Sequence, residues 1–201
     1  MLGLAGWAWR RRRAAGPVAV PQIERPRLGP APAPLPEAPL PAVPAPREPL
    51  DVTLEPLRLS LTLMNAALAY RLQVVNRGAL PIEGLAIGAD MISAHASLSR
   101  EEQLSGPGSG AVVQRIERLE PGESRIVEGE FRVPFRQIVP IRQGNATLLL
   151  PLARFRLEAQ GAAPVIRTFV VGQPGAKAGL QPFRLDLGPR VYPKLAQRAF
   201  A

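Results

Sequence analysis

Hydrophobic and polar residues alternate along most of the chain beyond residue 50, as in strands that bury one face and expose the other. The segment 124–134 shows this most clearly. Its apolar and charged side chains fall on opposite faces, with Val127, Phe131 and Val133 on one and Glu128, Glu130 and Arg132 on the other. We expect the first three side chains to lie in the core and the last three in solvent.

A turn signal stands directly before this strand. Glu120-Pro-Gly-Glu123 fits a type II turn, because proline presets the first central φ and glycine takes the positive φ of the second. A type II turn splays a two-residue hairpin, since its twist does not match that of paired strands. We therefore expect this turn to carry the chain from one sheet to the facing sheet of a sandwich.

Similar alternation predicts further strands at 57–63, 66–74, 80–91, 146–160, 165–171 and 183–187. Gly84 and Gly88 indicate a bulge or a close backbone approach in the third strand, and a shift of the apolar face within 146–160 indicates a bulge near 151–154. A short helical turn is expected at 192–200. The spacing of strands and turns predicts an all-β fold, an Ig-like antiparallel β-sandwich of about eight strands.

Changes in composition divide the chain into four segments: an apolar and arginine-rich membrane-proximal segment at 1–13, a Pro-rich linker at 14–49, the sandwich at 50–190, and a C-terminal tail or short helix at 191–201. Ten of the 24 residues from Pro26 to Pro49 are proline. Such a stretch favours an extended, disordered, polyproline-like spacer.

The first segment resembles the cytoplasmic end of a membrane helix, in which an aromatic belt is followed by positive charge. The residues that carry this pattern are Trp7, Trp9, Arg10, Arg11, Arg12 and Arg13. The apolar stretch Met1–Trp9 is too short to cross a bilayer, and its charges follow the apolar run, unlike those of a signal peptide. Three interpretations stay open: a short helix that frays in water, a short helix that lies on acidic lipid, or the end of a longer apolar span.

The net charge of +9 is spread unevenly along the chain. Residues 1–49 hold seven arginines and three glutamates, whereas residues 50–190 hold sixteen basic and thirteen acidic side chains. The arginines of the predicted strands alternate with core positions and do not form one basic face with stacking aromatics. This distribution argues against nucleic acid as a partner.

Candidate chemistry is sparse. The chain has no cysteine and one histidine, His95, so thiolate catalysis and the usual zinc ligands are excluded, and we expect no catalytic residue, metal or cofactor. Two pairs of carboxylates, Glu101 with Glu102 and Glu128 with Glu130, have no neighbour in the sequence that would suit them for general acid–base catalysis. The long loop 93–110 is either a tolerated insertion or a binding loop, because loops on rigid sandwiches often carry binding. Its candidate binding residues are His95, Arg100, Glu101 and Glu102.

Three motifs resemble the bacterial Ig-like modules of the CARDB adhesion type: Tyr70-Arg-Leu-Gln-Val-Val-Asn-Arg-Gly78, Pro81-Ile-Glu-Gly-Leu-Ala-Ile87 and Leu119-Glu-Pro-Gly-Glu123. The resemblance covers residues of about 57–133. It implies a non-catalytic spacer or binding domain of an envelope protein.

We therefore expect a non-enzymatic, membrane-associated structural or protein-interaction module. Its expected partners are membrane lipid at the N-terminus and an unidentified protein. The alternative is an anion-binding protein that uses its basic residues on nucleic acid or acidic lipid. A hydrolase that uses His95 also stays open. The expected location is the bacterial inner membrane. The arginine cluster favours its cytoplasmic side, whereas the resemblance favours the periplasmic side.

Overall fold

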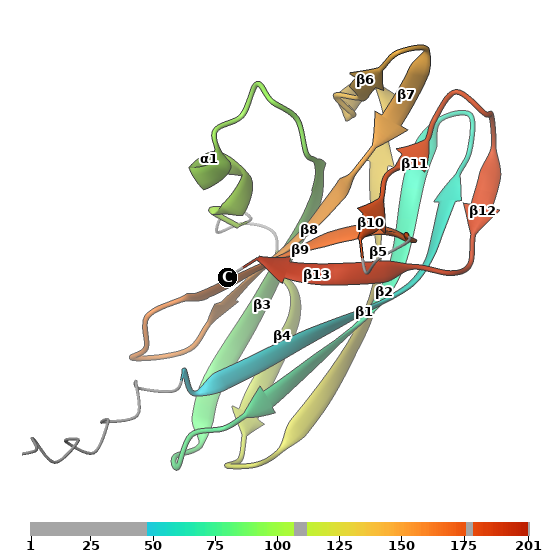
Figure 1. The fold of residues 1–201 in the computed structure, drawn as a ribbon. Coiled ribbons are helices and arrows are strands. Elements are labelled where there is room, and N and C mark those ends of the chain that lie inside the picture. The colour runs from blue at the N-terminus through green and yellow to red at the C-terminus, as the bar shows by residue number, and fades with distance from the viewer. Residues whose placement is uncertain (1–47, 107–111, 176–178, 201) are drawn as a thin grey trace, which may run out of the picture. The chain divides into compact units, whose positions relative to one another are not determined.

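The computed structural model describes residues 48–106, 112–175 and 179–200, and these form two facing β-sheets with a third, smaller sheet (Figure 1). The membrane-proximal segment 1–13 and nearly all of the linker 14–49 lie outside the described residues. Every pairing between the described strands is antiparallel. The predicted all-β antiparallel sandwich is confirmed.

The first sheet has the strand order β12-β1-β2-β5. Its strands are β1 (Leu50–Leu61), β2 (Asn65–Asn76), β5 (Ser124–Pro134) and β12 (Arg190–Tyr192). Strand β1 begins seven residues before the predicted strand at 57. Its register against β2 shifts between Pro56 and Arg58, because proline has no N–H to donate to the ladder. The buried positions therefore change from even to odd numbers along β1, and Leu57 is left exposed.

The second sheet has the order β10-β9-β8-β3-β4, and β13 also pairs with β9. Its strands are β3 (Ile82–Ser93), β4 (Val112–Leu119), β8 (Pro151–Glu158), β9 (Val165–Pro174), β10 (Leu180–Gln181) and β13 (Ala196–Phe200). Gly84 has a φ of 59°, and the register between β3 and β4 shifts at Gly88. Both irregularities agree with the bulge predicted from these glycines.

Two predictions about the C-terminal half are wrong. The apolar face shifts within 146–160 because β7 (Ala146–Leu149) and β8 belong to different sheets, and not because of a bulge in one strand. Strand β7 lies in the third sheet between β6 (Ile141–Gln143) and β11 (Phe183–Arg184). Residues 196–200, expected in a tail or short helix, form strand β13, since the exposed edge of β9 offers them backbone partners.

Two short helices complete the described residues: α1 (Arg100–Leu104) and the 3-10 helix η1 (Phe135–Gln137). Neither is long and apolar enough to cross a membrane.

A chain of aromatic rings joins the two large sheets in the core. Tyr70 of β2 and Phe131 of β5 stack with their ring centroids 4.5 Å apart, and both contact Phe155 of β8 at 5.4 and 5.8 Å. Phe155 also meets Phe169 of β9 at 6.0 Å. Val127 and Phe131 are buried and Val133 is partly buried against the core, whereas Glu128, Glu130 and Arg132 are exposed, which confirms the register predicted for this strand.

Glycine is required opposite the Tyr70 ring. Gly129 is the cross-strand partner of Tyr70, and a Cβ at position 129 would lie 2.6 Å from the Tyr70 hydroxyl oxygen. The ring covers the glycine backbone, and its burial raises the pKa of the Tyr70 phenol. The alternation in β5 thus includes a position without a side chain so that a large ring of β2 can fill the space.

The turn at 120–123 carries the chain from one sheet to the other, and a buried asparagine is hydrogen-bonded beside it. Gly122 has a φ of 78°, the amide of Glu123 donates to the carbonyl of Glu120 at 3.0 Å, and the turn connects β4 of the second sheet to β5 of the first. The predicted crossing between sheets is confirmed. The Asn76 side-chain amide donates to the carbonyl oxygens of Leu80 and Leu119 at 2.8 and 3.0 Å. Asn76 is fully buried, so it holds the end of β2 against this turn.

Candidate functional site

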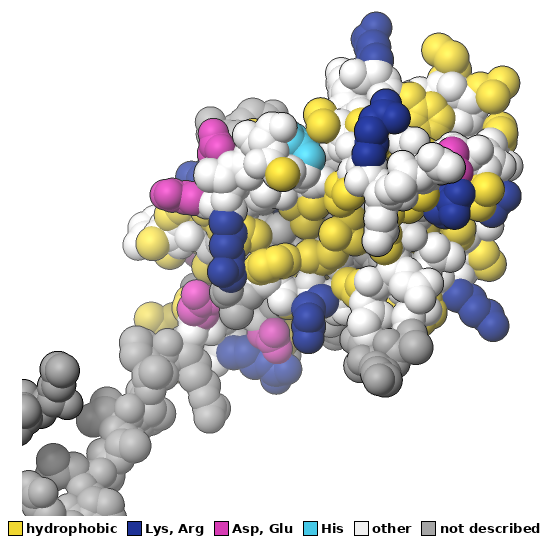
Figure 2. Space-filling model, turned by 45° about the horizontal axis from the view of Figure 1, so that its top comes forward, with side chains coloured by type: hydrophobic (Ala, Val, Ile, Leu, Met, Phe, Trp, Pro, Cys, Tyr) yellow, Lys and Arg dark blue, Asp and Glu magenta, His cyan; other side chains and the backbone are white. Residues whose placement is uncertain are grey.

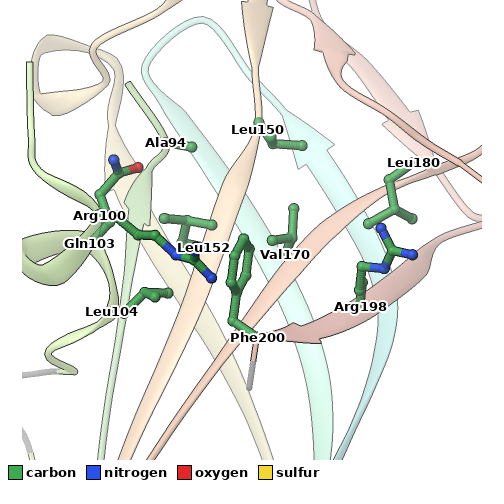
Figure 3. A pocket seen from close by; sticks show the side chains of 10 residues that line it. All are labelled: Ala94, Arg100, Gln103, Leu104, Leu150, Leu152, Val170, Leu180, Arg198 and Phe200. Atoms are coloured by element: carbon green, nitrogen blue, oxygen red, sulfur yellow. The ribbon is translucent and has the colours of Figure 1, made fainter. Parts of the chain in front are cut away.

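A cleft of about 540 Å³ lies on the outer face of the second sheet, between α1 and β13 (Figure 3). Its floor is formed by Leu152 of β8 and Val170 of β9, which are cross-strand partners. These side chains point away from the core, because they alternate with the core residues Ala153 and Phe169. Figure 2 shows hydrophobic side chains gathered across the middle of one face, with arginine and lysine side chains around them.

Helix α1 forms one wall of the cleft, and its first turn is stabilised by a capping box. The Ser99 hydroxyl accepts from the Glu102 amide at 3.1 Å, and the Glu102 carboxylate accepts from the Ser99 amide at 2.8 Å. The hydrogen bond from the Ser99 amide, and to a smaller extent the Ser99 hydroxyl, lowers the pKa of the Glu102 carboxyl. The carboxylate is therefore charged at neutral pH and is occupied by the cap.

The arginine of an ion pair within the second sheet also connects α1 to that sheet. Arg154 of β8 makes a bidentate contact with Asp90 of β3, with donor–acceptor distances of 2.7 and 2.5 Å. The same guanidinium donates to the Glu102 carbonyl at 3.2 Å, and the Thr168 hydroxyl donates to the Leu104 carbonyl at 3.5 Å. Both contacts satisfy carbonyls in the last turn of the helix, so the wall is attached to the strands that carry the floor.

Two arginines flank the opening of the cleft. The guanidinium carbon of Arg100 lies 5.6 Å from the centroid of the Phe200 ring, which is the geometry of a cation–π contact. Arg198 projects from β13 on the other side of Phe200 (Figure 3). Among the described residues, no carboxylate lies within 4 Å of either guanidinium.

Many arginines on the strands contrast with this pair, because carboxylates contact them. Arg71 lies 3.0 Å from Glu55 and 2.9 Å from Glu128, across three neighbouring strands of the first sheet. Arg118 contacts Glu83 at 2.9 Å and Glu120 at 2.6 Å. Such pairs reduce the positive field of the sheet faces, so the arginines at the cleft have the larger capacity for an external anion.

The four candidate residues from the sequence have different positions. Arg100 lines the cleft, whereas the Glu102 side chain faces its own helix start. Glu101 is exposed and does not line the cleft. His95 is partly buried, and its Nδ1 is a buried atom without a hydrogen-bond partner among the described residues. The loop thus contributes one of its candidate side chains to the cleft.

Sequence reasoning missed the residues that form the rest of the cleft, namely Leu150, Leu152, Val170, Leu180, Arg198 and Phe200. One signal for the floor was present. Phe169-Val170-Val171 is apolar without alternation, which indicates a strand covered on both faces. Residues 196–200 contain no such continuous apolar run, and their place beside β9 comes from long-range pairing.

Comparisons with known proteins give no family assignment. Neither a protein-family model nor a curated protein matches the sequence. A solved structure described as an ApaA protein from Bordetella pertussis is similar at 15% sequence identity and a TM-score of 0.33, covering 69% of this chain and 94% of that chain.

The groups that line the cleft are suited to binding a ligand. The cleft offers an apolar floor, an aromatic ring and two guanidiniums, which hold a ligand by burial and charge. The part of the chain that the structure describes contains no group of three or more His, Cys, Asp or Glu placed to hold a metal ion.

Proposed function

We propose that this protein is a non-enzymatic, membrane-associated structural or protein-interaction module, in which a β-sandwich presents a binding cleft. The observation that carries the proposal is the apolar cleft between α1 and β13, with Arg100 and Arg198 at its opening. A ligand there meets apolar surface and fixed positive charge. We further propose an unidentified protein as a partner of the module.

The sequence motifs support the choice of an Ig-like module. Asn76 and the turn at 120–123, which carry the CARDB-type resemblance, make hydrogen bonds that hold strand ends together: Gly122 donates to the Asn76 carbonyl at 2.8 Å. The side-chain oxygen of Asn76 accepts from the amide of Gly78 at 2.9 Å. The roles of these residues are structural, and they lie outside the cleft. In this proposal the motif residues build the module and the cleft supplies its contact.

Attachment to lipid is proposed for the segment 1–13, which lies outside the described residues. Replacing Arg10 to Arg13 with glutamine is expected to weaken binding of the full chain to anionic vesicles by about 2–4 kcal/mol. The reason is that each arginine near an anionic surface contributes about 1 kcal/mol. Flotation with vesicles of phosphatidylcholine and phosphatidylserine measures the change.

The matched control removes four exposed arginines from the sandwich and thus the same charge: Arg58, Arg115, Arg136 and Arg142, each changed to glutamine. This control is expected to retain most of the affinity, because the charges are not adjacent to the apolar segment. Equal losses in both variants would show that overall charge drives binding, and the attachment proposal would then be wrong.

The side of the membrane follows from the same arginines. If a longer apolar span precedes Arg10, the four consecutive positive charges after it stay on the cytoplasmic side, so we place the sandwich there. Alkaline phosphatase fused after Ala201, in the chain expressed from its complete reading frame, is expected to be inactive because its disulfides do not form in the cytoplasm. An active fusion would place the module in the periplasm.

A further inference from the structure

We infer that the cleft binds an amphipathic anion with a single apolar chain. The apolar chain of the ligand lies on the outer face of the second sheet, and its anionic group lies between Arg100 and Arg198. This inference rests on the proposed non-enzymatic function and adds the chemical class of the ligand.

The floor of the cleft accounts for the apolar part of the ligand. Leu152 and Val170 are 3% and 7% exposed, although they lie on the face of the sheet that points away from the core. Leu150 and Leu180 add further apolar side chains to the lining of the cleft (Figure 3). The volume of about 540 Å³ lies within the range of small-molecule sites. Moving an alkyl chain from water onto these apolar side chains is favourable.

The polar groups around the floor account for the sign of the charge. The nearby carboxylates of Asp90 and Glu102 are held by Arg154 and by the helix cap. The Gln103 amide donates to the Leu98 carbonyl at 3.0 Å, so this donor is also occupied. Arg100 and Arg198 remain, and the planar guanidinium group donates to carboxylate or phosphate oxygens in pairs.

The wall of the cleft is fixed before any ligand arrives. The capping box holds the start of α1, and the Arg154 guanidinium joins its last turn to β8. The position of Arg100 therefore depends on groups that are already hydrogen-bonded. A preformed site loses less conformational entropy on binding than a loop that must first become ordered.

Three alkyl compounds of equal chain length separate the contributions of chain and charge. Dodecanoate, dodecyl phosphate and dodecyltrimethylammonium are titrated into the isotope-labelled full chain at low salt and below their micelle concentrations, with methyl NMR as the readout. We expect both anions to shift the methyl resonances of Leu152 and Val170, and the cation to bind at least tenfold more weakly. The stronger of the two anions identifies the preferred head group.

Variants test the two arginines separately. Arg100→Gln and Arg198→Gln are each expected to weaken dodecanoate binding two- to fivefold, and the double variant about tenfold, in line with the modest strength of exposed charge pairs. Arg115→Gln is the matched control, because this exposed arginine of β4 lies outside the cleft. We expect it to leave the affinity unchanged.

Four results would overturn the inference: equal affinity for anion and cation, unchanged affinity in the double variant, methyl shifts confined to other parts of the chain, or the same shifts produced by self-association without amphiphile. None of them alters the vesicle binding by Arg10 to Arg13, so the proposed membrane function is tested independently. Conversion of dodecanoate or dodecyl phosphate to another compound, detected by mass spectrometry, would instead contradict the non-enzymatic function.

Discussion

Replacing Phe155 with alanine is expected to lower the free energy of unfolding by about 3–5 kcal/mol, the range for a fully buried phenylalanine. Phe155 has no exposed surface and contacts the rings of Tyr70, Phe131 and Phe169. Its loss removes the ring that links three others across the two sheets and leaves a cavity between them. Chemical denaturation followed by circular dichroism measures the change.

The matched control is Phe200→Ala, since this ring lies at the cleft and is 37% exposed. We expect a loss of about 1 kcal/mol or less for it, because the side chain is partly solvated in the folded protein. A loss of similar size in both variants would contradict the assignment of the core. Phe131→Ala, at a ring 8% exposed, is expected to fall close to Phe155→Ala.

Replacing Asn76 with leucine is expected to lower the free energy of unfolding by about 2–5 kcal/mol. The side-chain amide donates to the carbonyls of Leu80 and Leu119, and leucine has no donor. The buried Leu119 carbonyl left without a partner costs about 1–3 kcal/mol, and loss of the partly buried bond to the Leu80 carbonyl adds about 0.5–1.5 kcal/mol. The same denaturation measurement applies, and amide exchange at Gly122 should increase, because its hydrogen bond to the Asn76 backbone lies at the same junction.

Gln73→Leu provides the comparison for this variant. The Gln73 amide donates to the Ser124 hydroxyl at 2.9 Å, but it does so on the exposed face of the sheet. Water replaces that bond when it is lost, so we expect a change within about 0.5 kcal/mol. If Asn76→Leu were equally mild, Asn76 would not hold the junction between β2 and the turn at 120–123.

The two variants concern parts of the fold for which the sequence contained clear signals. Alternation in β2 and β5 places Tyr70 and Phe131 on the buried face, since a strand has a period of two residues. Pro121-Gly122 indicates a type II turn, and the incompatibility of that turn with a tight hairpin predicts the crossing between sheets. These inferences depend on local geometry, which the order of residues specifies directly.

Inferences that needed long-range pairing were less successful. The shift of the apolar face near Leu150 has two local explanations, a bulge or a change of sheet, and the pairing of β7 with β6 and β11 decided for the second. The short segment Ala196–Phe200 carries no periodic signal, so its strand conformation depends on the exposed edge of β9. A helical turn was the local preference, and backbone pairing overrode it.

The sequence by itself determined the strand class of the module, the buried face of its central strands and the turn that joins its sheets, because these depend on neighbours along the chain. The tertiary structure alone decided that Arg100 and Phe200, far apart in sequence, come within 5.6 Å over a floor of Leu152 and Val170. That proximity arises because β13 pairs with β9 while Arg154 holds α1 above β8. Contacts between segments so distant in the chain are selected by the energy of the packed whole and leave no local pattern in the sequence.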